Sequence, residues 1–230
     1  MRKLALSLVV VLALLIAADR IGVAIASGIV AGKLKSSGGL SSSPSVSIKG
    51  FPFLTQAVSG RYDRIEVAAT DLSRGGVRLS RLDVALIGSR IPLRAALSGN
   101  VSVVPVERLS AKAVVSYVNL VHRSKIAGLS MEPSDGGVRV TGRVTVLGQT
   151  VSASTVSTVR VERRDIVITA QSVAVQGQSS PTLNRAIAGL LDLRVGIGSL
   201  PYGLELDGVR VTSAGLVLSA HSGATVLRAP

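Results

Sequence analysis

Residues 48–56 read Ile48-Lys49-Gly50-Phe51-Pro52-Phe53-Leu54-Thr55-Gln56, and here the chain passes from a serine-rich stretch into a long run of strand-like sequence. The segment contains both phenylalanines of a 230-residue chain that has three tyrosines and no tryptophan. The interior must therefore be almost wholly aliphatic. We expect the two rings on this proline-stiffened turn to fill or close an apolar space. Two interpretations stay open: a local hydrophobic plug under a loop, and a part in ligand binding.

The N-terminus has the pattern of an export signal. Arg2 and Lys3 precede an apolar, uncharged run from Leu4 to Ala18, which ends at Asp19-Arg20. The run is shorter than the about 20 apolar residues that span a bilayer, although apolar character resumes at residues 21–31. Because Ala24-Ile25-Ala26 fits a signal-peptidase site, a cleaved leader and a retained membrane anchor both remain open. Positive charge at the start predicts a body outside the cytoplasmic membrane, in the periplasm or cell envelope.

Composition excludes several classes of function. The chain has no cysteine, which removes disulfides, thiolate metal sites and a cysteine nucleophile. The net charge of +13 suits a polyanionic partner such as anionic lipid headgroups or acidic envelope polymers. We expect no nucleic acid as a partner, because the protein is exported and has few aromatic side chains on which bases could stack. A solvated arginine-rich surface without any partner is the other interpretation.

The hydrophobic pattern predicts an α+β domain. We expect a helix over 19–35, whose Gly28 and Gly32 allow close packing on the protein's own sheet, and a flexible Ser/Gly-rich linker over 36–45. From about residue 59 the period is two, which indicates long strands. Further helices are expected over 110–125, with Ser110 as the cap, and over 182–193 after Ser180-Pro181; a hairpin through Val209/Val211 and Leu216/Leu218 follows. The domain prediction is an export signal or membrane anchor at 1–18 and a single domain at 19–230.

Two motifs carry a resemblance to a known family. Residues 48–56, joined to Gly60-Arg61-Tyr62-Asp63-Arg64-Ile65-Glu66-Val67, resemble the signature of the actinobacterial exported envelope family to which the mycobacterial lipomannan elongation factor belongs. The segments Leu200-Pro201-Tyr202-Gly203-Leu204 and Gly215-Leu216-Val217-Leu218 resemble that family's closing hairpin. The resemblance covers most of the chain from about residue 19 onward.

The resemblance implies a fold similar to that of the tubular lipid-binding proteins. In that fold a long, strongly curved antiparallel sheet wraps around a long helix and leaves an apolar groove. It also implies that the protein binds phospholipids, including phosphatidylinositol, and that it supports the assembly of lipomannan and lipoarabinomannan. No catalytic residues come with the family.

The candidate lipid-binding residues come from the first motif and from the apolar face of the helix expected near the C-terminus. Aliphatic side chains would take up acyl chains, with about 0.8 kcal/mol for each buried methylene, while arginines hold an anionic headgroup. A filled core would have the same periodicity as a groove. The candidates are Phe51, Phe53, Leu54, Tyr62, Leu183, Ile187, Leu190, Leu191 and Tyr202.

Chemistry beyond binding finds little support in the sequence. His122 and His221 are far apart and have no carboxylate at ligand spacing, so we expect no metal and no cofactor. Acidic pairs such as Asp63/Glu66 interleave with arginine or apolar residues, which is typical of strand-face salt bridges. We therefore expect a non-catalytic phospholipid-binding or lipid-transfer protein at the outer face of the cytoplasmic membrane. The alternative is a scaffold for envelope glycosyltransferases without a ligand groove.

Overall fold

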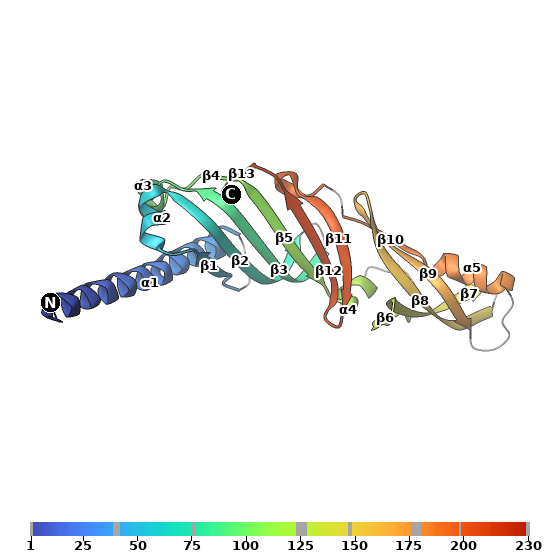
Figure 1. Cartoon of the computed structure of the whole chain (residues 1–230). Helices are drawn as coiled ribbons and strands as arrows, with labels where there is room; N and C mark the ends of the chain where they lie inside the picture. The colour runs from blue at the N-terminus through green and yellow to red at the C-terminus, as the bar shows by residue number, and fades with distance from the viewer. Residues whose placement is uncertain are drawn as a thin grey trace. The chain divides into compact units, whose positions relative to one another are not determined.

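The computed structural model describes residues 2–38, 42–74, 77–122, 128–146, 149–175, 181–197 and 199–228 (Figure 1). The fold is of the α+β class, with a long N-terminal helix and large antiparallel sheets, as the sequence predicts. The helices are α1 (Arg2–Gly38), α2 (Phe53–Ser59), α3 (Leu93–Ser98), α4 (Tyr117–Val121), α5 (Pro181–Leu191) and a short 3-10 helix, η1 (Pro201–Gly203).

The strands pair in the orders β1-β2-β3-β5-β12-β11, β10-β9-β8-β7-β6 and β13-β4. Their bounds are β1 (Ser45–Lys49), β2 (Arg61–Arg74), β3 (Val77–Arg90), β4 (Val103–Val106), β5 (Arg108–Val115), β6 (Ser130–Ser134), β7 (Gly137–Val146), β8 (Gln149–Glu162), β9 (Asp165–Val175), β10 (Leu193–Gly196), β11 (Glu205–Thr212), β12 (Gly215–Ser222) and β13 (Thr225–Arg228).

The chain divides into two compact units. The first comprises Met1–Leu72, Leu82–Ala111 and Ser222–Pro230, and the second comprises Ser73–Arg81 and Lys112–His221. Each unit has a hydrophobic core of its own. Because β2, β3, β5 and β12 contribute residues to both units, the single domain expected over 19–230 stays a prediction.

The apolar N-terminal run and the helix expected after it form one continuous helix of 37 residues, α1. No proline interrupts the segment, and it is rich in leucine and alanine, which favour helix. Its large apolar side chains from Leu4 to Ile16 are exposed. The helix is long and apolar enough to cross a membrane, and only 6% of its most apolar window is buried.

The C-terminal half of α1 packs against the core of the first unit through Val23 and Ala26. The expected close packing at Gly28 and Gly32 is wrong, since a Cβ at either position would meet nothing within 4 Å. Of the expected linker at 36–45, residues 36–38 still belong to α1 and residues 39–41 lie outside the described residues. β1 then pairs antiparallel with β2, which places Ile48 opposite Ile65 in the core.

In the second unit, α5 covers the apolar face of the sheet β10-β9-β8-β7-β6 (Figure 1). Val138 and Val140 of β7 lie opposite Ser157 and Thr155 of β8, and all four are buried together with Ile187 of α5. This face follows from the alternation of valines with arginines and threonines along β7.

The helix expected over 110–125 is wrong in its first part, where the chain forms β5 instead. Leu109 and Val115 of this strand are buried. The helix prediction failed here because β-branched and small residues in a short segment suit a sheet as well as a helix. The turn into α4 comes at Ser116, whose Oγ accepts a hydrogen bond from the Asn119 N–H at 3.4 Å. Residues 123–125 of the expected helix lie outside the described residues.

The C-terminal part of the chain follows the sequence prediction more closely. α5 begins at Pro181 and ends at Leu191, within two residues of the expected helix end. The expected hairpin is present as β11 and β12, with Val209 opposite Leu218 and Val211 opposite Leu216. β13 follows and pairs with β4, a pairing that the hydrophobic pattern did not indicate.

Candidate functional site

The turn that carries the first motif is held against α1 by Asp19. Asp19 is 2% exposed, and its Oδ1 accepts a hydrogen bond of 2.9 Å from the Leu54 N–H. Its Oδ2 forms an ion pair of 2.5 Å with the Arg20 guanidinium. The residue before α2 is Pro52, which provides no side-chain cap. A carboxylate from α1 therefore satisfies one of the free N–H groups at the start of α2.

Phe53 and Tyr62 lie in the core of the first unit. They are 7% and 5% exposed, and their ring centroids are 6.3 Å apart at an interplanar angle of 41°. Burial raises the pKa of the Tyr62 phenol. The α1 backbone comes so close to Phe53 that a Cβ at Gly22 would be 3.3 Å from two ring carbons. Packing alone accounts for this pair of rings, and their part in ligand binding stays a prediction.

Phe51 and Leu54 have a different environment, on the surface of the same turn. They are 62% and 41% exposed. The Arg20 guanidinium carbon lies 5.2 Å from the centroid of the Phe51 ring, within the range of a cation–π contact. The two phenylalanines of the chain are therefore used in opposite ways, one inside the core and one outside it.

Gln56 provides the polar connection of this motif. The side chain is 8% exposed; its Oε1 accepts from the Asp63 N–H at 2.9 Å, and its Nε2 donates to the Lys49 carbonyl at 3.4 Å. Gly50 has φ +101°, and a Cβ there would lie 2.4 Å from Gln56 Nε2. Glycine is thus required at this position both by the backbone and by the packed glutamine. Much of the motif serves to fasten α2 onto β1 and β2.

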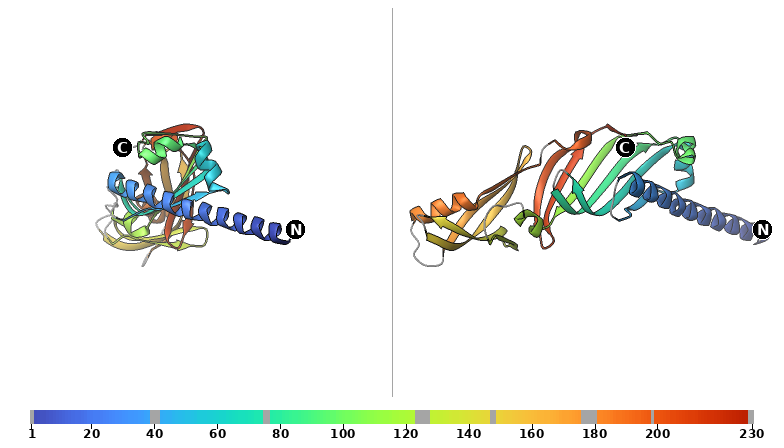
Figure 2. Two further views of the ribbon diagram at one scale, coloured as in Figure 1. Left: turned by 90° about the vertical axis from the view of Figure 1, so that its left-hand side faces the viewer. Right: turned by 180° about the vertical axis from the view of Figure 1, so that it is seen from behind.

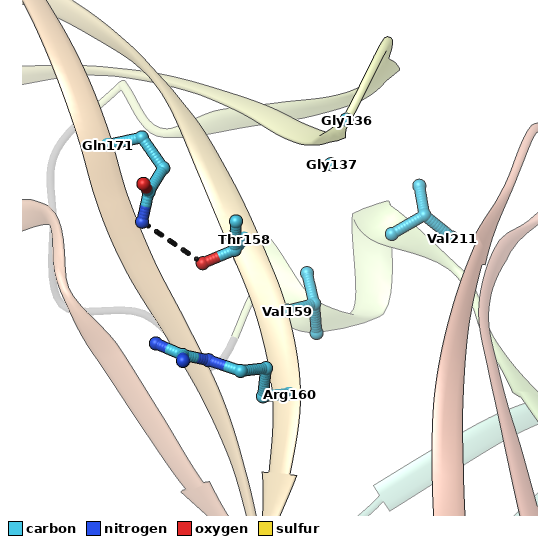
Figure 3. Close-up of a pocket in the computed structure, with 7 residues that line it drawn as sticks. All are labelled: Gly136, Gly137, Thr158, Val159, Arg160, Gln171 and Val211. Carbon is cyan, nitrogen blue, oxygen red and sulfur yellow. Dashed lines mark hydrogen bonds between the residues drawn. The ribbon is translucent and has the colours of Figure 1, made fainter.

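An open hollow of about 440 Å³ lies within the second unit (Figure 3). Val159 of β8 and Val211 of β11 point toward each other in it, while the Gln171 Nε2 donates to Thr158 Oγ1 at 3.2 Å. Arg160 is exposed and has no ion-pair partner among the described residues. The hollow is of the size of ligand pockets, roughly 300–1,000 Å³. The Arg160 side chain lies on the face of β8 that carries Thr158, opposite to the face from which Val159 points toward Val211 (Figure 3). The hollow is lined by Gly136, Gly137, Thr158, Val159, Arg160, Gln171 and Val211.

The candidate residues from the C-terminal half all lie in the second unit. Ile187 is fully buried in its core. Tyr202 is 42% exposed and has φ +58°, in the left-handed region. The side chains of Leu183, Leu190 and Leu191 lie outside the described part of the structure.

The structure thus brings together Phe51, Phe53, Leu54 and Tyr62, which belong to the first unit, and the other five candidates belong to the second. A groove formed by all nine stays a prediction. Sequence reasoning missed Asp19, which it treated as the end of the leader, and Arg160, which is one of many arginines on strands. The sequence did indicate a role for Asp19, because it is the one carboxylate among residues 1–36, which are otherwise uncharged or basic. Such a carboxylate needs a partner when it is buried.

No group of three His, Asp or Glu side chains that could hold a metal ion occurs in the described ranges. Among known families, one model matches residues 17–221 and is described as LmeA-like phospholipid-binding. The chain belongs to this LmeA-like phospholipid-binding family. The match covers both the Asp19-fastened turn and the strands that line the hollow. Searches of curated proteins and of solved structures gave no match.

Proposed function

We propose that the protein is a non-catalytic phospholipid-binding or lipid-transfer protein, tethered by α1 to the outer face of the cytoplasmic membrane. Its lipid is an anionic phospholipid of the phosphatidylinositol type. It works in the periplasm or cell envelope and supports assembly of lipomannan and lipoarabinomannan. The observation that carries this proposal is the family match over residues 17–221.

The hollow in the second unit supports the binding of an anionic headgroup. Arg160 has no carboxylate partner among the described residues, so its donors are available to a phosphate. The Thr158 and Gln171 side chains add hydrogen-bonding groups on the face of β8 that carries Arg160, and Val159 and Val211 provide an apolar wall for methylenes of a tail on the opposite face. Each methylene that leaves water there adds about 0.8 kcal/mol.

The contacts of α1 support its retention as an anchor. Signal-peptidase cleavage after Ala24-Ile25-Ala26 would remove Asp19, and with it the acceptor for the Leu54 N–H. It would also remove Val23, Ala26 and the Gly22 backbone that pack on the core of the first unit. A folded first unit therefore uses residues that a cleaved protein would lack. Intact mass spectrometry of the protein from the native membrane tests this, and a mature N-terminus after residue 26 would contradict it.

Lipid content tests the binding proposal. The protein purified from its native membrane is extracted with organic solvent, and the released lipids are weighed by mass spectrometry. The proposal predicts co-purifying anionic phospholipid in stoichiometric amount. A lipid-free protein that still restores envelope glycolipids to a deletion strain would refute it and would favour the glycosyltransferase scaffold.

Arg160→Gln tests the assignment of the headgroup. Loss of a charge-assisted hydrogen bond at an exposed site is expected to weaken binding of labelled phosphatidylinositol by about tenfold, or about 1.4 kcal/mol. Arg185→Gln is the matched control, because Arg185 is an exposed arginine of α5 in the same unit and has no ion-pair partner among the described residues. Equal affinities of the two variants would contradict a headgroup role for Arg160.

A further inference from the structure

The point where α1 loses its uniform apolar character is also the point where α2 is attached. The large apolar side chains of α1 from Leu4 to Ile16 are exposed, and Asp19 and Arg20 are the first charged residues after Lys3. Asp19 binds the Leu54 N–H, and Arg20 contacts the Phe51 ring. Figure 2 shows α2 beside the middle of α1, in agreement with Figure 1. The start of α2 is thus fixed at the level where Asp19 and Arg20 interrupt the apolar side chains of α1, which continue with the exposed Ile21, Ile25 and Ile29.

The outer side of α2 carries two apolar residues beside the exposed Thr55 and Ser59. Phe53, Gln56 and Ala57 face the core of the first unit. Leu54 and Val58 are one turn apart on the other side and are 41% and 76% exposed. Phe51, just before the helix, is 62% exposed.

An aromatic ring, two aliphatic side chains and an arginine at the end of a membrane span are the residues that anchor a protein in the headgroup layer. Single exposed apolar residues are ordinary on protein surfaces. Here the three lie within eight residues of the chain, and the 53%-exposed Arg20 guanidinium, which binds Asp19 through Nη2, keeps other N–H donors for the phosphates of anionic lipids. Aromatic and basic side chains concentrate at this depth of a bilayer.

We propose that Phe51, Leu54 and Val58 form a membrane-contact surface that inserts into the headgroup layer of the same bilayer that holds α1. This surface fixes the first unit against the membrane in addition to the single helix. The inference rests on the proposed tether, because without a membrane-inserted α1 nothing brings the surface to a bilayer. The occupant is an anionic lipid surface.

The absence of cysteine makes a direct test practical, since any introduced cysteine is unique. Single variants Leu12→Cys, Leu54→Cys, Val58→Cys and Leu97→Cys of the full chain are labelled with an environment-sensitive fluorophore. They are reconstituted in vesicles of phosphatidylcholine and phosphatidylglycerol that contain lipids with a quencher near the glycerol or near the chain end. Leu97 is the matched control, a 79%-exposed leucine of the neighbouring helix α3. α3 ends beside Lys33, whose Nζ donates to the Gly99 carbonyl. Because Lys33 lies 14 residues along α1 beyond Asp19, we expect Leu97 to lie farther from the bilayer than Leu54 and Val58.

The expected result is blue-shifted emission at residues 54 and 58 with quenching by the shallow quencher, deep quenching at residue 12, and water-like emission at residue 97. Deep quenching at residue 12 with water-like emission at 54 and 58 would overturn the inference and leave the tether standing. Lack of quenching at residue 12 would overturn the tether and the inference together. Equal shallow quenching at residues 97 and 54 would also overturn it, because the contact would then not be specific to this surface.

Discussion

Asp19→Ala is expected to loosen α2 from α1. The substitution removes the acceptor of the 2.9 Å hydrogen bond from the Leu54 N–H and leaves the Arg20 guanidinium without its 2.5 Å ion-pair partner. Loss of a helix-capping side chain costs about 0.5–2 kcal/mol, and a buried donor left unsatisfied costs about 1–3 kcal/mol. Because Leu54 is 41% exposed and water can reach its backbone in part, we expect about 1–2 kcal/mol.

Amide hydrogen exchange of the full chain in nanodiscs measures this directly. A loss of about 1–2 kcal/mol in local stability corresponds to a roughly 5–30-fold faster exchange of the Leu54 amide. Asp19→Asn keeps a side-chain oxygen as acceptor and should have a smaller effect. Asp135→Ala, at an exposed carboxylate of the second unit, is the control and should leave the Leu54 amide unchanged. Unchanged exchange in Asp19→Ala would refute the role of Asp19 as the cap of α2.

Three further substitutions have definite outcomes. Gly22→Leu should lower the free energy of unfolding by about 1–3 kcal/mol through overpacking against Phe53, whereas Gly28→Leu should not; equal melting temperatures of the two variants would contradict this. Tyr117→Phe should cost about 1 kcal/mol in urea unfolding, because the 2.7 Å hydrogen bond to the Thr212 carbonyl is lost, and Tyr202→Phe should have no effect. The Arg64 hydrogen bond, supported by Lys49 and opposed by burial, lowers the pKa of Glu66 from its usual range. The ionised Glu66 carboxylate therefore stabilises the fold at neutral pH, and this stabilisation is lost as the pH falls through the lowered pKa. The melting temperatures of wild type and Glu66→Gln should then converge in acid, and a constant difference would contradict this prediction.

The first motif was recognisable in the sequence, but the roles of its residues were not. Both phenylalanines have the same local context around Pro52, yet Phe53 is 7% exposed and Phe51 is 62% exposed. The difference depends on Gly22 and Asp19 of α1, which lie some thirty residues earlier in the chain. No periodicity within residues 48–56 contains that information.

Secondary structure was predictable where the pattern was long and regular. The alternation along β7 fits a strand only, and the i, i+4, i+7 spacing in α5 fits a helix only; both elements occur as expected. The segment that forms β5 is short and rich in alanine and valine, so its periodicity fits two structures, and pairing within the sheet selects the strand. The hollow beside Arg160 was not predictable, because its walls come from strands β7, β8, β9 and β11.

By itself the sequence determined the α+β class, the apolar N-terminal helix, the absence of disulfides and the membership of a phospholipid-binding family, because composition, period and motif are local properties of the chain. Only the tertiary structure decided which of two phenylalanines is buried, that Asp19 caps a helix far along the chain, and which arginine lines a hollow without an ion-pair partner among the described residues. These three features depend on contacts between segments that are distant in sequence. The neighbouring segments, and not the residue itself, determine how deeply a side chain is buried and whether it has a partner.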